Sequence, residues 1–275
     1  MKENSLWLES INRGERFNFG LNWQNYNINL NEDILKKATI SMQKLLGVEN
    51  LIEKKFLDVG SGSGIMSLVA ANMGAYVYSF DFDENSYQAT KLLKEKFHVN
   101  NDNWDIKLGS VLNREFMESY KDFDIVYSWG VLHHTGDLKN ALNNVLLPLS
   151  KNGTLVLAIY NDQGFKSKIW EKIKKSYCKS KFKKIIINII FIPFFFTISL
   201  LIGLIKYKNP FHQFLKYSSY RGMAIYHDWI DWLGGYPFEY LKPEEIIMFF
   251  LRRGFSLKNL KTTNSLGCNE FVFKK

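Results

Sequence analysis

Cysteine is scarce in this chain. Its 275 residues include only two cysteines, Cys178 and Cys268, and they lie ninety positions apart. That spacing supplies neither the paired ligands of a zinc site nor a disulfide framework, so we expect no bound metal and a reduced, cytoplasmic setting. The opening residues, MKENSLWLES, have no apolar run after their lysine, so we also expect no secretory leader.

Acidic residues are nearly absent from one stretch. Residues 166–184 hold nine lysines and a single acid, Glu171, and so carry +8 of the net charge of +9. The rest of the chain is nearly neutral. A single basic patch is not the charge distribution of a protein that grips nucleic acid across a whole face, so we expect no specific nucleic-acid partner.

Apolar runs alternate with helical patterns over much of the chain. The runs FDIVYSW (123–129) and GTLVLAIY (153–160) are apolar on both faces, which is typical of buried parallel strands. The alternation stops after residue 160 and resumes at residue 243. We predict an α/β fold with an N-terminal cap and helix (1–48), a ligand-binding core (49–162), a helical and aromatic insertion (163–242), and a C-terminal helix with two strands that complete the core sheet (243–275).

The segment FLDVGSGSG, residues 56–64, predicts a strand, a glycine-rich turn and the start of a helix. Asp81 ends the next predicted strand, 21 residues after Gly60, where a carboxylate can accept hydrogen bonds from ribose hydroxyls. The spacing is not that of a dinucleotide site, because Ile65 stands where the last glycine would be. Asp58 would repel a pyrophosphate and attract an ammonium group. The loop therefore predicts a cationic, phosphate-free nucleoside ligand.

Five segments, in their order and spacing, resemble the class I S-adenosylmethionine-dependent methyltransferases. They are FLDVGSGSG, YVYSFDFDENS, KLGSVLN, FDIVYSWGVLHHT and GTLVLAIYND, within residues 50–162, and the strands expected in 255–273 also fit. The resemblance implies a Rossmann-like, seven-stranded sheet with helices on both faces and an antiparallel last strand. The helical insertion would precede the last two strands. The implied cofactor is S-adenosyl-L-methionine.

The same resemblance implies roles for individual residues. Asp58 and the loop glycines would hold the methionine part of the cofactor, Asp81 the ribose and Phe82 the adenine. Trp23, in the segment FGLNWQNY, would close over the cofactor. The implied cofactor residues are Asp58, Gly60, Gly62, Gly64, Asp81, Phe82, Ser110, Val111, Trp129 and Trp23. Gly130 would line the methyl-transfer pocket together with Trp129.

Histidines provide the candidate bases. An alcohol acceptor must lose a proton as its new bond forms, and imidazole can take it. His133 and His134 follow the fourth predicted strand, at the carboxyl edge where open α/β sheets bind ligands, and His227 lies in YHDWIDW. The alternative is a loop brace for the first two and a packing role for the third. The other predicted acceptor contacts are Tyr160, Asn161 and Asp228.

Residues 221–239, RGMAIYHDWIDWLGGYPFE, combine aromatic side chains with turn-forming glycines. Such a composition suits a lid over a polar ring such as a sugar. The alternative is an aromatic mini-core that holds the insertion in place. The sequence leaves both interpretations open.

Residues 185–205 form an uncharged run, IIINIIFIPFFFTISLLIGLI, with lysines on both sides. As a helix the run would extend about 31 Å, enough to cross a bilayer. A single span conflicts with the sheet, because it would separate the last two strands from the first five. The alternatives are a buried helical pair broken at Pro193 that serves as a lid or dimer contact, a helix in the membrane interface, a re-entrant hairpin, and a span with a different C-terminal fold.

The sequence therefore predicts an S-adenosylmethionine-dependent methyltransferase that acts on a small-molecule acceptor. The expected reaction is O-methylation of a sugar or polysaccharide precursor, or of a lipid-linked, quinol-like metabolite. The alternatives are an RNA methyltransferase, with the lysines as its electrostatic footprint, and a non-catalytic binding module. We expect a cytoplasmic protein, in peripheral contact with the inner membrane surface through residues 166–208 if the apolar run docks there.

Overall fold

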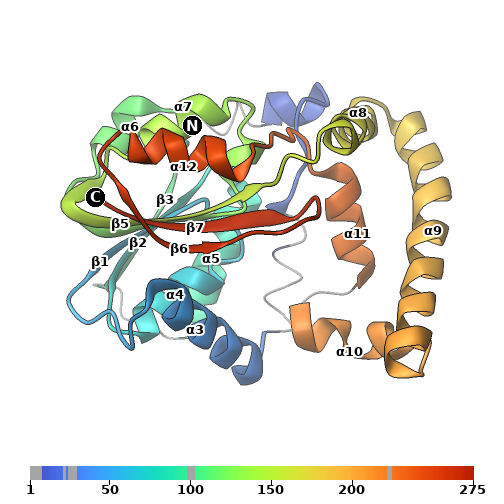
Figure 1. Cartoon of the computed structure of the whole chain (residues 1–275), viewed down its shortest axis with the longest axis horizontal. Coiled ribbons are helices and arrows are strands. Elements are labelled where there is room, and N and C mark those ends of the chain that lie inside the picture. The colour runs from blue at the N-terminus through green and yellow to red at the C-terminus, as the bar shows by residue number, and fades with distance from the viewer. Residues whose placement is uncertain (1–7, 21–22, 24–29, 98–102, 222–224) are drawn as a thin grey trace.

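Seven strands form one sheet in the computed structural model, which describes residues 8–20, 23, 30–97, 103–221 and 225–275 (Figure 1). The strands are β1 (Lys55–Val59), β2 (Tyr76–Asp81), β3 (Trp104–Leu108), β4 (Phe123–Trp129), β5 (Leu149–Tyr160), β6 (Ser256–Lys261) and β7 (Cys268–Lys274). Their order across the sheet is β3-β2-β1-β4-β5-β7-β6. Strands β1 to β5 pair in parallel, and β7 pairs antiparallel with β5 and β6. The predicted seven-stranded sheet with an antiparallel last strand is confirmed.

Helices cover both faces of this sheet. One face carries α3 (Glu32–Leu46), α4 (Ile65–Asn72) and α5 (Glu84–Lys96), and the other carries α6 (Arg114–Glu118), α7 (Leu138–Asn144) and α12 (Pro243–Leu251) (Figure 1). Each face has its own apolar core. Phe56 belongs to the core under α3 and α4, and its neighbour Leu57 to the core under α7 and α12, because successive side chains of a strand point to opposite faces.

Local signals set the ends of the first helix that packs on the sheet. The side chain of Asn31 accepts a hydrogen bond of 3.0 Å from the backbone N–H of Ile34, which caps the start of α3. Gly47 ends the helix in the left-handed conformation, with φ of 70°. Both ends of α3 are thus set by residues next to the helix itself.

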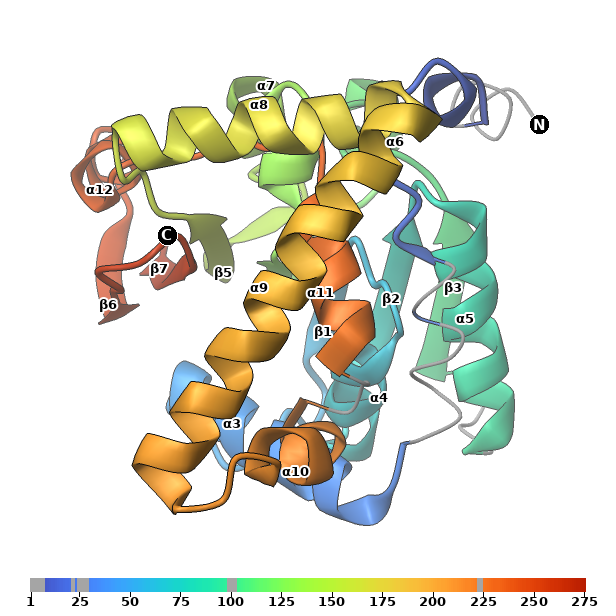
Figure 2. The same cartoon turned by 90° about the vertical axis from the view of Figure 1, so that its right-hand side faces the viewer.

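Four helices of the insertion lie beyond the carboxyl ends of the parallel strands. They are α8 (Phe165–Lys179), α9 (Lys181–Tyr207), α10 (His212–Arg221) and α11 (Ile225–Gly234). Helix α11 lies between the sheet and α9, and α9 runs along the outside of the molecule (Figures 1 and 2). The insertion therefore adds a layer to one end of the sheet and does not interrupt it.

The structure of α9 and of the sheet excludes three of the alternatives for the apolar run. The helix is continuous over 27 residues with Pro193 inside it, so the broken helical pair and the re-entrant hairpin are both wrong. Strands β6 and β7 share the sheet of β1 to β5, so the span with a different C-terminal fold is wrong as well. Within the part of the chain that the structure describes, α9 is the one helix long and apolar enough to cross a membrane, and by itself this is weak evidence.

Candidate functional site

The glycine loop between β1 and α4 is tightly packed. Gly60 and Gly62 have φ values of 81° and 56°, in the left-handed region that favours glycine. The N–H of Gly60 donates to the carbonyl oxygen of Phe80 at 2.9 Å. A Cβ atom on Gly60 would stand 2.4 Å from Cγ1 of Val131. The loop is thus fixed between the end of β2 and the turn that follows β4.

Two carboxylates, one buried and one partly buried, flank the loop. Asp58, on β1, accepts a hydrogen bond of 2.6 Å from the Ser67 hydroxyl. Asp81, the last residue of β2, accepts from the N–H groups of Gly62 and Asp83, each at 2.9 Å. Burial raises the pKa of both carboxyls to about 7, and the charge of Asp83 adds to this effect at Asp81. A ligand that brings a positive charge or hydroxyl donors would stabilise the ionised form of both groups.

The N-terminal segment reaches over this loop. The indole Nε1 of Trp23 lies 3.4 Å from the position that a Cβ atom on Gly62 would take. The guanidinium of Arg16 lies 5.4 Å from the ring centre of Phe82 and donates to the carbonyl oxygen of His134 at 2.7 Å. The segment therefore connects the end of β2 to the turn that follows β4.

The turn after β4, η2 (Leu132–His134), places two imidazole rings 4.5 Å apart between their centres. His133 is fully buried, and its Nδ1 accepts a hydrogen bond of 3.2 Å from the N–H of Tyr160. His134 has its Nδ1 2.6 Å from the carbonyl oxygen of Pro237. Burial lowers the pKa of His133 well below its ordinary value and that of His134 to about 3, so both rings are neutral at physiological pH.

Aromatic rings build a wall next to these histidines. The ring of Tyr160, at the end of β5, lies 4.0 Å from that of His133, 4.9 Å from Phe238 and 6.0 Å from Trp232. Lys174 of α8 is completely buried here. Its Nζ lies 4.0 Å from the ring centre of Trp232 and donates to the carbonyl oxygen of the same residue. The carboxyl edge of the sheet thus combines two neutral imidazoles, several aromatic rings and the buried amine of Lys174.

Comparison with known proteins assigns the central part of the chain to a family. A family model described as a methyltransferase domain matches residues 57–155, the stretch that runs from β1 into β5. Residues 57–155 match a methyltransferase domain, and the sheet has the class I methyltransferase fold. Enzymes with this domain depend on S-adenosylmethionine, in agreement with the sequence prediction of the family and its cofactor.

Individual relatives support the same assignment. A ubiquinone biosynthesis O-methyltransferase of Pelagibacter ubique (strain HTCC1062) is 26% identical over 39% of this chain and 42% of its own length. A ribosomal protein L11 methyltransferase of Helicobacter hepaticus (strain ATCC 51449 / 3B1) is 30% identical over 44% of this chain and 36% of its own length. The chain therefore spans less than half the length of these curated relatives. The crystal structure of magnesium protoporphyrin IX methyltransferase from Synechocystis PCC 6803 has the same fold, with a TM-score of 0.53 at 13% identity over 88% of this chain and 84% of that one.

The methyltransferase loop fits S-adenosylmethionine in its chemistry. Asp58 is buried and Asp81 is partly buried, and the raised pKa values of both acids favour a ligand with a cation and hydroxyl donors. The cofactor has an ammonium group, a sulfonium centre and ribose hydroxyls. Gly64, like Gly60, is packed too closely for a side chain, because a Cβ atom would stand 2.9 Å from Thr90. Trp129 at the end of β4 is 45% exposed, and nothing lies within 4 Å of an added Cβ at Gly130. Trp129 and Gly130 therefore leave space for a ligand at the carboxyl end of β4.

Other predicted site residues are engaged with protein groups. Ser110 accepts a 3.2 Å hydrogen bond at its hydroxyl from the N–H of Leu112, and Val111 is buried in the core under α7. The side-chain amide of Asn161 donates to the carbonyl oxygens of Thr263 and Ser265 at 2.7 and 3.2 Å. Asn161 therefore braces the loop between β6 and β7, and its contact with an acceptor stays a prediction.

Two predicted residues, His227 and Asp228, lie on α11. Asp228 accepts a hydrogen bond from the hydroxyl of Tyr217 on α10. The side chain of His227 lies outside the described part of the structure. The roles of both residues stay predictions, and the structure brings together His133, His134 and Tyr160 at the sheet edge.

The structure adds three residues to this edge that were not predicted from the sequence. Arg16 has no sequence signal, because its partner His134 is 118 positions away. Lys174 belongs by sequence to the basic patch, but Trp170 and Tyr177 share its helix face at a spacing of three to four residues, which is a signal of burial. Glu239, within the predicted lid, accepts from the N–H groups at the start of α7, including that of Leu138 at 3.0 Å.

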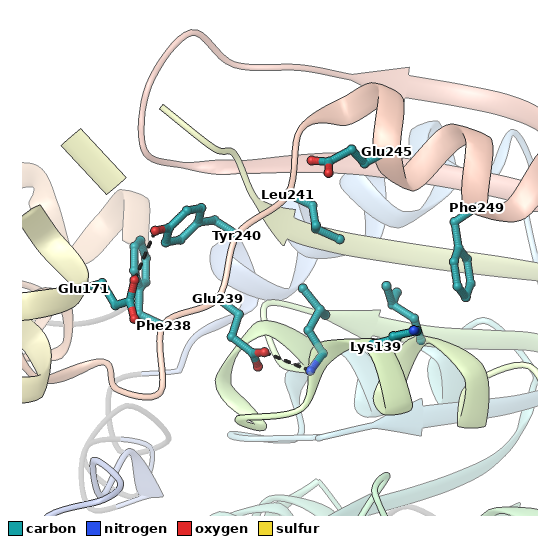
Figure 3. Close-up of a pocket in the computed structure, with 10 residues that line it drawn as sticks. Lys139, Glu171, Phe238, Glu239, Tyr240, Leu241, Glu245 and Phe249 are labelled. Atoms are coloured by element: carbon teal, nitrogen blue, oxygen red, sulfur yellow. Dashed lines mark hydrogen bonds between the residues drawn. The ribbon is translucent and has the colours of Figure 1, made fainter. Parts of the chain in front are cut away.

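A cavity of about 520 Å³ lies outside this edge, among α7, α8 and α12 (Figure 3). None of the predicted site residues lines it. The hydroxyl of Tyr240 donates to Glu171 across its wall at 3.1 Å, and Phe238 faces it while also contacting Tyr160. Residues 238–241 therefore separate the cavity from the candidate site. Among the described residues, no group of three or more metal-ligating side chains is placed to hold a metal ion.

Proposed function

We propose that this chain transfers a methyl group from S-adenosylmethionine to a hydroxyl oxygen of a small aromatic acceptor in the cytoplasm. His134 is the proposed base. The observation that carries the proposal is the 2.6 Å contact between Nδ1 of His134 and the carbonyl oxygen of Pro237. A carbonyl oxygen can only accept, so Nδ1 holds the proton and Nε2 keeps a lone pair that can take another.

His133 differs in its tautomer. Its Nδ1 accepts from the N–H of Tyr160, so the neutral ring carries its proton on Nε2, which is buried and has no hydrogen-bond partner. The lone pair on Nδ1 of His133 therefore already accepts a hydrogen bond and is not free to take a proton from an acceptor. We assign His133 to positioning: it fixes the end of β5 and supports the ring of His134.

The low basicity of His134 favours an acidic hydroxyl. Burial holds the pKa of this imidazole at about 3, and a weak base removes a proton efficiently only from an acceptor that gives it up readily. A phenol or quinol meets that condition better than a sugar alcohol. The rings of Tyr160, Trp232 and Phe238 also match a flat aromatic acceptor. The similarity to ubiquinone biosynthesis O-methyltransferases agrees with a quinol-like substrate.

In the proposed reaction each part of the chain has one task. Asp58, Asp81 and the glycine loop bind the cofactor, which when bound supplies a methyl group on a sulfonium centre open to attack by oxygen. Tyr160 and its neighbouring rings orient the acceptor and exclude water. His134 removes the proton from the acceptor hydroxyl at Nε2 as the new carbon–oxygen bond forms.

Label transfer tests the proposal. The purified protein is incubated with methyl-tritiated S-adenosylmethionine and either a catechol, a hydroquinone, a free sugar or RNA. We expect label in the phenolic products only, and loss of that label in the His134→Gln variant. Label in the sugar or in RNA would contradict the acceptor class. Binding of S-adenosylhomocysteine without transfer to any compound, including those of a native extract, would favour the non-catalytic alternative.

A further inference from the structure

Helix α9 presents a broad apolar face that no other described element covers. Figure 2 shows the helix along the side of the molecule, in front of α10 and α11. Isoleucine, leucine and phenylalanine make up most of this face, although such side chains are usually buried in a soluble domain. Phe182, Ile185, Ile189, Ile190, Phe194 and Ile205 are each more than half exposed. We call this surface the α9 face.

The opposite side of α9 fixes the helix to the protein. Ser199 and Gly203 are buried there, and a Cβ atom on Gly203 would stand 2.5 Å from the carbonyl oxygen of Pro210. The rings of Phe191 and Phe195 pack on Trp170 of α8, at 5.4 and 6.4 Å between ring centres. The helix is therefore held in one orientation, and the α9 face points away from the domain.

Lysines mark both ends of the α9 face. Lys181, Lys183 and Lys184 stand at its first turn, and Lys206 and Lys208 at its last. Residues 172–227 contain no acid. An apolar strip about 30 Å long, with cations at both ends, matches a surface that is apolar inside and anionic at its headgroups.

A second copy of the chain fits this surface less well. In a two-fold dimer through the α9 face, the helices would run parallel or antiparallel. Either arrangement brings the lysines of one copy next to lysines of the other, without acids between them. Like charges at both ends of such an interface oppose association, whereas anionic lipid headgroups would neutralise them.

We propose that the α9 face docks the protein on the surface of an anionic lipid bilayer. The helix lies in the plane of the interface and does not cross it, because α8 before it and α10 after it both belong to the same folded domain (Figure 2). Burial of the exposed isoleucine and phenylalanine side chains among the acyl chains supplies the main attraction. The lysines add attraction to anionic headgroups.

The α9 face also lies close to the proposed catalytic edge. A series of ring contacts connects the two: Tyr160 to Trp232 at 6.0 Å, Trp232 to Trp170 at 5.3 Å, and Trp170 to Phe191 at 5.4 Å. Docking would therefore place the acceptor site near the membrane, where a quinol with an apolar tail resides. This last step rests on the proposed function, whereas docking itself does not.

Vesicle sedimentation tests the docking surface. The full chain is mixed with vesicles of pure phosphatidylcholine or of equimolar phosphatidylcholine and phosphatidylglycerol, and the bound fraction is measured. We expect binding to the anionic vesicles. The double variant Ile189→Glu/Ile205→Glu should bind at least about tenfold less tightly, because both side chains would enter the acyl region. The control Leu92→Glu changes a residue of α5 that is 56% exposed and lies outside the α9 face, and it should bind like the wild type.

A second variant separates charge from apolar burial. Lys181→Gln/Lys183→Gln/Lys184→Gln should lower the affinity for anionic vesicles by about fivefold for each lysine that reaches the surface, and leave the affinity for neutral vesicles unchanged. Circular dichroism and S-adenosylhomocysteine binding report whether every variant is folded. No sedimentation with either vesicle type, or equal binding by wild type and the Ile189→Glu/Ile205→Glu variant, would overturn the proposal. So would a dimer in analytical ultracentrifugation that this variant dissociates while vesicles are not bound.

The same variants keep the two proposals apart. Methyl transfer to a water-soluble hydroquinone does not require a membrane, so the Ile189→Glu/Ile205→Glu variant should keep wild-type turnover of that acceptor. Its transfer to a long-tailed quinol in anionic vesicles should fall along with its binding. Docking without any methyl transfer would refute the proposed function and leave the α9 face intact as a membrane surface.

Discussion

His134 donates a hydrogen bond from Nδ1 to the carbonyl oxygen of Pro237, 103 residues further along the chain. The N–H of Glu239 donates to the carbonyl oxygen of His133 at 2.9 Å, so two bonds join the η2 turn to residues 237–239. The aromatic segment 221–239, for which the sequence leaves a lid and a mini-core open, therefore also sets the tautomer of the proposed base.

The two histidines should respond differently to substitution. His134→Gln should lower kcat by about a hundredfold or more, because no other group is assigned to take the proton, and leave cofactor affinity unchanged. His133→Ala should mainly lower stability, by about 1–3 kcal/mol, because it leaves the N–H of Tyr160 buried without its acceptor. Steady-state kinetics and thermal unfolding of both variants check this. Equal losses of kcat with equal stability would contradict the division of roles.

Removal of a partly buried charge should separate cofactor binding from folding. Asp81→Asn should weaken the binding of S-adenosylhomocysteine by about tenfold or more, because the amide accepts less strongly from ribose hydroxyls. The melting temperature at pH 8 should change little, because removal of a disfavoured charge offsets the loss of one of the two N–H bonds, from Gly62 and Asp83, that only an oxygen can accept. Calorimetric titration and thermal unfolding measure the two effects. Unchanged affinity would remove Asp81 from the cofactor site.

Cofactor affinity should rise with pH through neutrality. The folded pKa values of Asp58 and Asp81 are about 7, above their ordinary value of 3.8. Their contribution to stability is therefore present below pH 4 and lost as the pH rises through 7. A cationic ligand needs the ionised carboxylates, so affinity should increase about tenfold per group from pH 6 to pH 8. Because the pKa of His134 is about 3, kcat should stay flat over the same range.

Titrations of S-adenosylhomocysteine in buffers of different ionisation enthalpy would count the protons released on binding. Proton release near pH 7 is the expected result, and the Asp58→Asn variant should release fewer. Binding without proton release, together with an affinity that does not change with pH, would contradict the raised pKa values.

The fold was predictable because its signals are local. The runs FDIVYSW and GTLVLAIY form the central strands β4 and β5, as predicted, and Asn31 and Gly47 limit α3 through contacts within a few residues. The predicted break of the helix at Pro193 does not occur, and the reason is physical. Proline removes one hydrogen bond, a cost of about 3 kcal/mol, but the packing of Phe191 and Phe195 on α8 continues on both sides of it.

The site was only partly predictable because its polar contacts join distant positions. The family pattern placed Asp58, Asp81 and the two histidines at one edge. The tautomers of those histidines depend on Tyr160 and Pro237, which no local pattern connects to them. The proposed division into base and brace therefore rests on contacts between residues far apart in the sequence.

Two glycines at the edge should differ in their tolerance of a side chain. Gly60→Ala should strongly destabilise the fold and abolish cofactor binding, because its Cβ would collide with Val131 at 2.4 Å. Gly130 has a similar φ of 80°, but nothing lies within 4 Å of its added Cβ. Gly130→Ala should therefore lose only about 1–2 kcal/mol from backbone strain. Thermal unfolding of the two variants tests the contrast, and equal losses would mean that packing around Gly60 is looser than described.

The buried Lys174 predicts a stability gain from its removal. It is fully buried, and burial lowers its pKa from 10.5 to about 7, against the weaker effects of Cys178 and Asp231. Between pH 7 and pH 10 the unfolded chain binds more protons at this lysine than the folded one does, so its contribution makes stability rise with pH in that window. Below pH 7 the folded protein holds a buried cation at its full cost. Lys174→Met keeps the packing against Trp232 and removes the charge, so it should raise the melting temperature at pH 6 by about 2 °C or more and flatten the rise above pH 7. A lower melting temperature at pH 6 with an unchanged slope would instead show that the ring contacts and the bond to the Trp232 carbonyl outweigh the desolvation of Lys174.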